Sequence, residues 1–157
     1  MTEVCFYHLT RRRLDDALPV LLEKSLERDW RVVVQSADAE RLKTLDARLW
    51  SYEPDKFLPH GTKADGEPET QPIYLTCEGD NPNSADVRFF VHGASAAPVL
   101  ADAAAAPTTR AVLMFDDAEA DGARAQWKTL REVGHELVYY QENERGGWEE
   151  RKREQAR

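Results

Sequence analysis

Residues 4–50 decide the fold, and they read VCFYHLTRRRLDDALPVLLEKSLERDWRVVVQSADAERLKTLDARLW. Residues 4–9 form a short β-branched and aromatic run, and residues 31–35 form a second one, RVVVQ; both are typical of buried strands. The stretch 14–30 between them has apolar residues at helical spacing, and residues 36–50 repeat that pattern. Strand, helix, strand and helix in succession predict a βαβ unit and a mainly parallel sheet.

Two residues set the expected starts of these helices. Pro19 falls inside the first apolar pattern, so we expect the first helix to begin there, with the proline in its first turn. Ser36 is a residue type that caps helices, so we expect it to be the N-cap of the second helix. The apolar side of that second helix is built from Leu42, Leu45, Leu49 and Trp50.

The rest of the chain alternates in the same way. Proline and glycine across residues 54–68 mark a long irregular connection. Asp116 and Asp117 resemble a helix entry, and Gly134 stands where a glycine often ends a helix. The predicted strands are 73–77, 87–92, 111–115 and 136–141, and the predicted helices are 94–106, which is rich in alanine, and 116–133. The fold class is therefore α/β, a Rossmann-like three-layer sandwich with helices on both faces of a mainly parallel sheet.

The length of 157 residues fits a single domain with one core. We assign this domain to residues 1–148. Residues 149–157 are charged throughout, and we expect them to be a frayed tail.

The composition argues against several classes of protein. The net charge of −8 disfavours general binding to a nucleic-acid backbone, and no apolar run approaches the ~18–20 residues that span a bilayer. At the start, an apolar stretch precedes the basic residues 11–13, the reverse of a secretory signal. We therefore expect a cytoplasmic protein that binds neither DNA nor membranes directly. In that compartment Cys5 and Cys77 are expected to be buried, reduced thiols.

A sheet of this kind also suits nucleotide-binding enzymes. The dinucleotide fingerprint needs GxGxxG directly after the first strand, but this chain has no glycine before Gly61. Residues 61–66 have the GxxxxG spacing of a P-loop, but Glu67 and Pro68 replace its Lys and Ser/Thr. The four histidines, His8, His60, His92 and His135, stand singly and form no metal-binding motif. We expect no catalytic residue, cofactor or metal, and a nucleotide-binding enzyme on the same scaffold remains the alternative.

A basic ridge is predicted on the helix over residues 116–133. Arg124, Lys128 and Arg131 lie at positions i, i+4 and i+7, so they share one face, with Trp127 on the adjacent apolar stripe. A cationic ridge beside an apolar slot suits an acidic peptide that ends in an apolar side chain and a free carboxylate. The alternative is a solvated face next to core residues.

A second feature is aromatic. Trp50 ends a predicted helix, and Phe57 lies in the proline-flanked connection with Pro59 and His60. One interpretation is that the connection folds back and buries both rings. The other is an exposed aromatic surface for a protein partner.

The same residues carry a family resemblance. The sequence resembles the chi subunit of bacterial DNA polymerase III, an accessory protein of the clamp loader. The resemblance spans almost the whole chain, and the matching pieces are Phe6-Tyr7-His8-Leu9, Leu45-Asp46 with Leu49-Trp50, Phe57-Leu58-Pro59-His60, Gln71-Pro72-Ile73, Arg124 with Trp127-Lys128 and Gly134-His135, Tyr139-Tyr140-Gln141, and Gly147-Trp148.

The resemblance implies a protein without catalytic activity that acts in DNA replication. It implies that the protein binds the acidic C-terminal tail of single-stranded DNA-binding protein, which ends in Pro-Phe, and links it to the clamp loader. The psi subunit or its equivalent would be the second partner. The residues expected to bind the tail are Arg124, Trp127, Lys128 and Arg131, and those expected to bind the second partner are Trp50, Phe57, Pro59 and His60.

Overall fold

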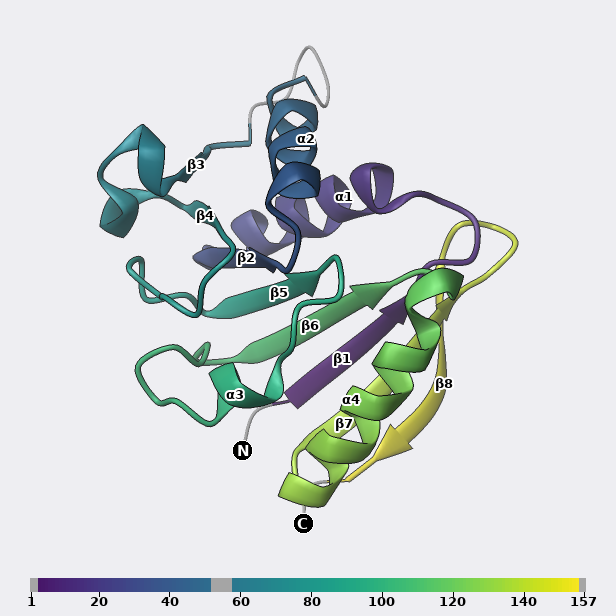
Figure 1. The fold of residues 1–157 in the computed structure, drawn as a ribbon. Coiled ribbons are helices and arrows are strands. Elements are labelled where there is room, and N and C mark those ends of the chain that lie inside the picture. The colour runs from purple at the N-terminus through teal and green to yellow at the C-terminus, as the bar shows by residue number, and fades with distance from the viewer. Residues whose placement is uncertain (1–2, 52–57, 156–157) are drawn as a thin grey trace.

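Strand β1, Glu3–His8, lies inside the sheet and pairs in parallel with β6, Arg110–Phe115, on one side and with β7, Glu136–Glu142, on the other. The computed structural model describes residues 3–51 and 58–155 (Figure 1). Within these residues the sheet has eight strands, in the order β3-β4-β2-β5-β6-β1-β7-β8. Among these pairs the antiparallel one is β7 with β8. The remaining strands are β2 Val32–Ser36, β3 His60–Thr62, β4 Ile73–Thr76, β5 Val87–Val91 and β8 Trp148–Glu154.

Helices cover both faces of the sheet, as predicted. Helices α1, Leu14–Glu27, and α2, Ala39–Trp50, pack against one face (Figure 1). Helices α3, Ala97–Leu100, and α4, Ala120–Val133, pack against the other. The strand pleat sends alternate side chains to the two faces: in β1, Cys5 joins the α1–α2 core, whereas Val4 and Phe6 join the α3–α4 core. The three-layer α/β sandwich is confirmed. None of the described helices has the length and apolar character needed to cross a membrane.

Helix α1 begins earlier than predicted. It starts at Leu14, so Pro19 lies inside the helix and not in its first turn. A proline at this position removes one hydrogen bond to the preceding turn. Pro19 is buried within the helix.

The N-cap of α2 also differs from the prediction. Asp38 caps this helix, because its carboxylate accepts hydrogen bonds from the N–H groups of Glu40 and Arg41. Ser36 is instead the last residue of β2, and its hydroxyl lies 2.7 Å from Nδ1 of His92 on the neighbouring chain segment.

The alanine-rich stretch forms far less helix than predicted. Of residues 94–106, only α3 is an α-helix, because side chains from elsewhere bind the backbone of this stretch. Gln126 on α4 accepts from the N–H of Ala96 and donates to the carbonyl of Ala94. The buried Arg88 guanidinium donates to the carbonyls of Glu78, Asp80 and Ala105. Burial lowers the pKa of Arg88 to about 10, so it stays charged at neutral pH.

The two cysteines lie in different surroundings. Cys5 is buried as predicted, and burial raises the pKa of its thiol to about 12. Cys77 is exposed, so the prediction of a buried thiol there is wrong. It follows the last residue of β4, where the chain has already left the sheet.

The long connection contains structure that was not predicted. Residues 54–57, with Pro54 and Phe57, lie outside the described residues. Beyond them, β3 adds a short parallel strand to β4 and two 3-10 turns follow, Lys63–Asp65 and Pro68–Thr70.

Within the predicted tail, residues 149–154 belong to a strand and do not fray. Residues 148–154 form β8, which pairs antiparallel with β7 at the edge of the sheet. Trp148 packs edge-on against Tyr7, with ring centroids 4.8 Å apart, and Arg153 pairs with Glu136 at 2.9 Å. Charged side chains are compatible with an edge strand, because one side of such a strand faces water and only its backbone needs a partner.

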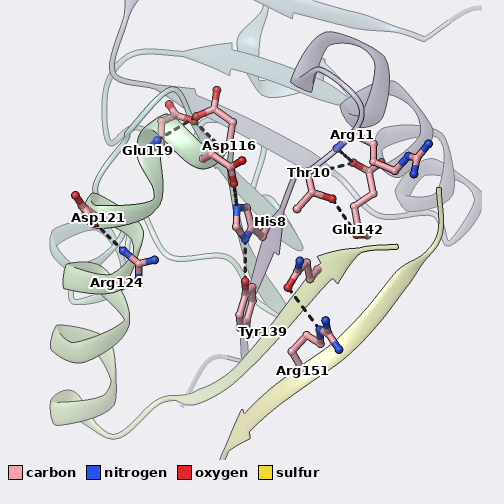
Figure 2. A network of polar contacts seen from close by, with 12 residues as sticks. His8, Thr10, Arg11, Asp116, Glu119, Asp121, Arg124, Tyr139, Glu142 and Arg151 are labelled. Carbon is pink, nitrogen blue, oxygen red and sulfur yellow. Dashed lines mark hydrogen bonds and ion pairs between the residues drawn. The ribbon is translucent and has the colours of Figure 1, made fainter. Parts of the chain in front are cut away.

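A buried carboxylate connects the start of the chain to this edge. The side chain of Glu142, at the end of β7, is fully buried, and one of its oxygens accepts from the N–H groups of Thr10, Arg11 and Arg12 at 2.8–3.2 Å. Figure 2 shows Glu142 beside Thr10 and Arg11. Nε of Arg12 donates to the other oxygen, and the same guanidinium donates to the carbonyl of Gly146. Burial alone would raise the pKa of Glu142, but the hydrogen bonds from Arg12 and Arg11 outweigh it and lower this pKa.

Replacing Glu142 with Gln should destabilise the fold. The amide keeps one acceptor oxygen but turns N–H donors toward Arg12, so at least one charge-assisted hydrogen bond is lost. We expect a loss of about 1.5–3 kcal/mol in the free energy of unfolding, measured by urea denaturation. Glu144→Gln, an exposed change in the adjoining turn, is the control and should stay within about 0.5 kcal/mol.

The same carboxylate should make stability depend on pH. Because folding lowers its pKa, ionised Glu142 stabilises the fold above the pKa of an unfolded glutamate. That contribution is lost as the pH falls through the lower folded-state pKa. Between about pH 5 and pH 3, wild type should therefore lose more stability than Glu142→Gln does. Identical pH profiles for the two proteins would contradict this assignment.

Candidate functional site

A pocket of about 230 Å³ lies between α4 and the strands β1, β6 and β7. Its floor is aromatic: Phe6 and His8 come from β1, Phe115 from β6 and Tyr139 from β7. Helix α4 supplies Ala120, Ala123, Arg124 and Trp127, and β8 supplies Lys152.

Small residues create the space. Ala120 and Ala123 are three positions apart, so both lie on the side of α4 that faces the sheet. Their short side chains leave room above the aromatic floor. One turn further along, the larger Trp127 closes the gap, and its ring packs edge-on against Phe6 at 5.1 Å. Trp127 therefore lines the pocket one turn beyond the two alanines.

His8 orders the floor of the pocket. Its Nδ1 lies 2.8 Å from the Tyr139 hydroxyl and its Nε2 lies 2.6 Å from the Asp117 carboxylate (Figure 2). The imidazole stacks on the ring of Phe115, with centroids 4.7 Å apart. Burial raises the pKa of Tyr139, and the positive charges of Arg151 and Arg124 partly offset that rise.

Cations line the rim. Arg124 is largely exposed, 76% for its side chain, and pairs with the fully exposed Asp121 at 2.7 Å (Figure 2). Lys128 is exposed one turn further along α4. Arg131 is half-buried, does not line the pocket and lies 3.9 Å from Glu154 of β8. On the other rim, Nζ of Lys152 lies 5.6 Å from the centre of the Trp127 ring.

The structure thus brings together Arg124 and Trp127 of the predicted tail-binding residues, with Lys128 next to them. The sequence analysis did not predict five other residues that line the pocket, namely Phe6, His8, Phe115, Tyr139 and Lys152. Phe6 and His8 are alternate residues of a predicted strand and must share a face, which is the one sequence signal that could have found them.

Of the predicted partner-binding residues, Trp50 and His60 lie together near the end of α2. Trp50 is 57% exposed, and its ring lies 4.3 Å from that of His60. His60 itself is buried, with Nε2 3.0 Å from the Asp46 carboxylate. The exposed Trp50 ring therefore packs against a buried imidazole. Pro59 is half-buried, and Phe57 lies outside the described residues.

The two sides of α2 should respond differently to truncation. Trp50→Ala should cost no more than about 1 kcal/mol, because most of its ring is already in water. Leu45→Ala on the same helix should cost about 2–5 kcal/mol, because Leu45 is fully buried. Thermal unfolding of the two variants checks this, and equal losses would mean that Trp50 is part of the core.

In the loop that would hold a phosphate, backbone N–H groups already donate hydrogen bonds within the protein. In nucleotide-binding sheets the loop after the first strand presents its N–H groups to the phosphates. Here the N–H groups of Thr10, Arg11 and Arg12 are bonded to Glu142. Among the residues that the structure describes, no group of three or more His, Cys, Asp or Glu side chains is placed to hold a metal ion.

These features define a small α/β domain whose clearest site is an apolar pocket with a cationic rim. The sequence matches the family described as DNA polymerase III chi subunit, HolC, over residues 1–138. A protein of Rickettsia prowazekii (strain Madrid E), described as a probable DNA polymerase III subunit chi, is 33% identical over 100 residues, which are 64% of this chain and 61% of that protein. The chain therefore spans about three fifths of the length of this curated relative.

The chain belongs to the DNA polymerase III chi subunit family. This is a family of non-catalytic accessory subunits of a replicative polymerase, so the family resemblance seen in the sequence is confirmed and the alternative of a nucleotide-binding enzyme is not supported. The match includes all of α4 and ends at residue 138 within β7, so β8 lies beyond it.

Proposed function

We propose that this protein is an accessory subunit of the polymerase III holoenzyme that binds the acidic C-terminal tail of single-stranded DNA-binding protein and links it to the clamp loader. The observation that carries the proposal is the pocket under α4, with its aromatic floor and cationic rim. An aromatic residue at the end of the tail enters the pocket, and the cations hold the carboxylates outside it.

The floor suits an aromatic ring. Phe6, Phe115 and Tyr139 present ring faces and edges at several angles, and aromatic pairs prefer such edge-on or offset contacts. A proline before the terminal residue directs the chain out of the pocket, because its fixed φ keeps the backbone extended.

The rim suits carboxylates. Arg124 and Lys128 are one turn apart on α4 and project the same way, and the guanidinium can bind a carboxylate with two hydrogen bonds. The existing pair between Arg124 and Asp121 is fully exposed to water, and exposed pairs of this kind contribute little. A peptide carboxylate can therefore replace Asp121 at small cost.

The overall charge opposes an acidic ligand. With a net charge of −8, attraction must come from the local cations and act over a short range. Binding should weaken as salt rises, because these rim charges are exposed and screened.

The surface at Trp50 supports a second contact. An exposed tryptophan, fixed by a buried histidine, has the character of an interface anchor. We assign this surface, with Phe57 and Pro59, to the psi subunit or its equivalent in the clamp loader.

Replacing the α4 cations should weaken binding of the tail. A hydrogen bond to a charged group contributes about 1.5–3 kcal/mol, so Lys128→Ala and Arg124→Ala should each reduce affinity for a tail peptide by roughly 10-fold to 100-fold. The measurement is calorimetric titration of the peptide at low salt. Lys43→Ala, which removes an exposed lysine on α2, is the matched control and should bind like wild type.

Two further titrations make this test decisive. A peptide without its terminal phenylalanine should bind far more weakly if the ring fills the pocket. Wild-type affinity in both α4 variants, with normal folding, would show that the tail binds elsewhere. Saturable binding of ATP or NAD at low micromolar concentration would instead favour a nucleotide-binding protein.

A further inference from the structure

Strand β8 contributes one residue to the pocket, Lys152, and the family match does not cover this strand. The match ends at residue 138, whereas β8 is Trp148–Glu154. In the β7–β8 ladder Lys152 stands opposite Tyr139, a residue of the pocket floor. Directly opposite residues share a face of the sheet, so Lys152 lies on the pocket side.

The neighbouring residues of β8 confirm this orientation. Arg153 stands opposite Val138, whose side chain belongs to the core on the α1–α2 face. Arg153 pairs there with Glu136 and Glu150, at 2.9 Å and 2.6 Å. The strand thus places one cation toward the pocket and the next one away from it.

The ammonium group of Lys152 is held at the mouth of the pocket and remains accessible. Its Nζ lies 5.6 Å from the centre of the Trp127 ring, within the range of a cation–π contact. The side chain is 54% exposed, and its ammonium group lies 3.7 Å from the Glu154 carboxylate. A partly exposed pair of this length contributes little, so the ammonium can bind a ligand without a large loss.

We propose that Lys152 is an additional residue of the peptide site and that it holds the terminal carboxylate of the peptide together with Arg124. This inference rests on the proposed function. Arg124 and Lys152 are the two cations that line the pocket itself, one from α4 and one from β8. The carboxylate of a C-terminal residue is attached one carbon from the side chain that fills the pocket, so it must lie at the pocket mouth. It then binds both cations, beside the Trp127 ring that Lys152 contacts.

The test uses the full chain and two synthetic tail peptides, one with a free C-terminal carboxylate and one with a C-terminal amide. Lys152→Gln should weaken binding of the free acid by roughly 3-fold to 5-fold, as expected for loss of a partly exposed charge contact. The same substitution should leave binding of the amide nearly unchanged. Lys152→Arg keeps the charge and should bind the free acid within about 2-fold of wild type.

Arg153→Gln is the matched control, because it removes the adjacent cation from the other face of β8. It should bind the free acid like wild type. If Arg153→Gln weakens binding as much as Lys152→Gln, the effect comes from loosening β8, and the proposed contact is wrong. If Lys152→Gln binds the free acid with wild-type affinity, the proposed contact is also wrong, whereas the proposed function is unaffected. No binding of the free acid by wild type overturns both proposals.

Discussion

The Glu142 carboxylate is the contact on which the arrangement of the site depends. It holds three successive N–H groups of the loop after β1, and through Arg12 it also holds the turn that follows β7. The Arg12 guanidinium lies 5.7 Å from the centre of the Trp148 ring, at the start of β8. This ion pair, whose carboxylate is buried, therefore contacts the strand that carries Lys152. It also occupies the loop position where related sheets bind phosphate, which removes that chemistry from this chain.

The two faces of the sheet differ in function: one supplies most of the core, and the other carries the pocket. On one face, α1 and α2 bury leucines against the strands, and Leu18, Leu22 and Leu45 are all fully buried. On the other face, α3 is one turn long and α4 turns alanines toward the sheet. The first face supplies the larger core and therefore much of the stability. The second leaves a space in which aromatic side chains of β1, β6 and β7 can contact a ligand.

The charges of the molecule reinforce this division. Its net charge is −8, yet two cations, Arg124 and Lys152, line the pocket, and Lys128 is exposed one turn from Arg124. Their carboxylate neighbours, Asp121 and Glu154, are exposed or partly exposed, so these pairs are weak and exchangeable. The strong pair, between Arg12 and Glu142, is buried and structural. Burial thus separates the charges that hold the fold from those available to a partner.

The sequence by itself determined the alternation of strands and helices, the two covered faces and the cationic side of α4, because these follow from periodicity and spacing within one element. The end of α4 was also predictable, since Gly134 takes the left-handed conformation, φ 103°, that glycine permits. Only the tertiary structure decided where β8 lies, why residues 94–106 are mostly not helical, and how the pocket is assembled. Those features depend on contacts between residues far apart in the chain, such as Arg88 with Ala105 and Lys152 with Trp127. The strand order β6-β1-β7-β8 brings the pocket residues together, and no local pattern encodes that order.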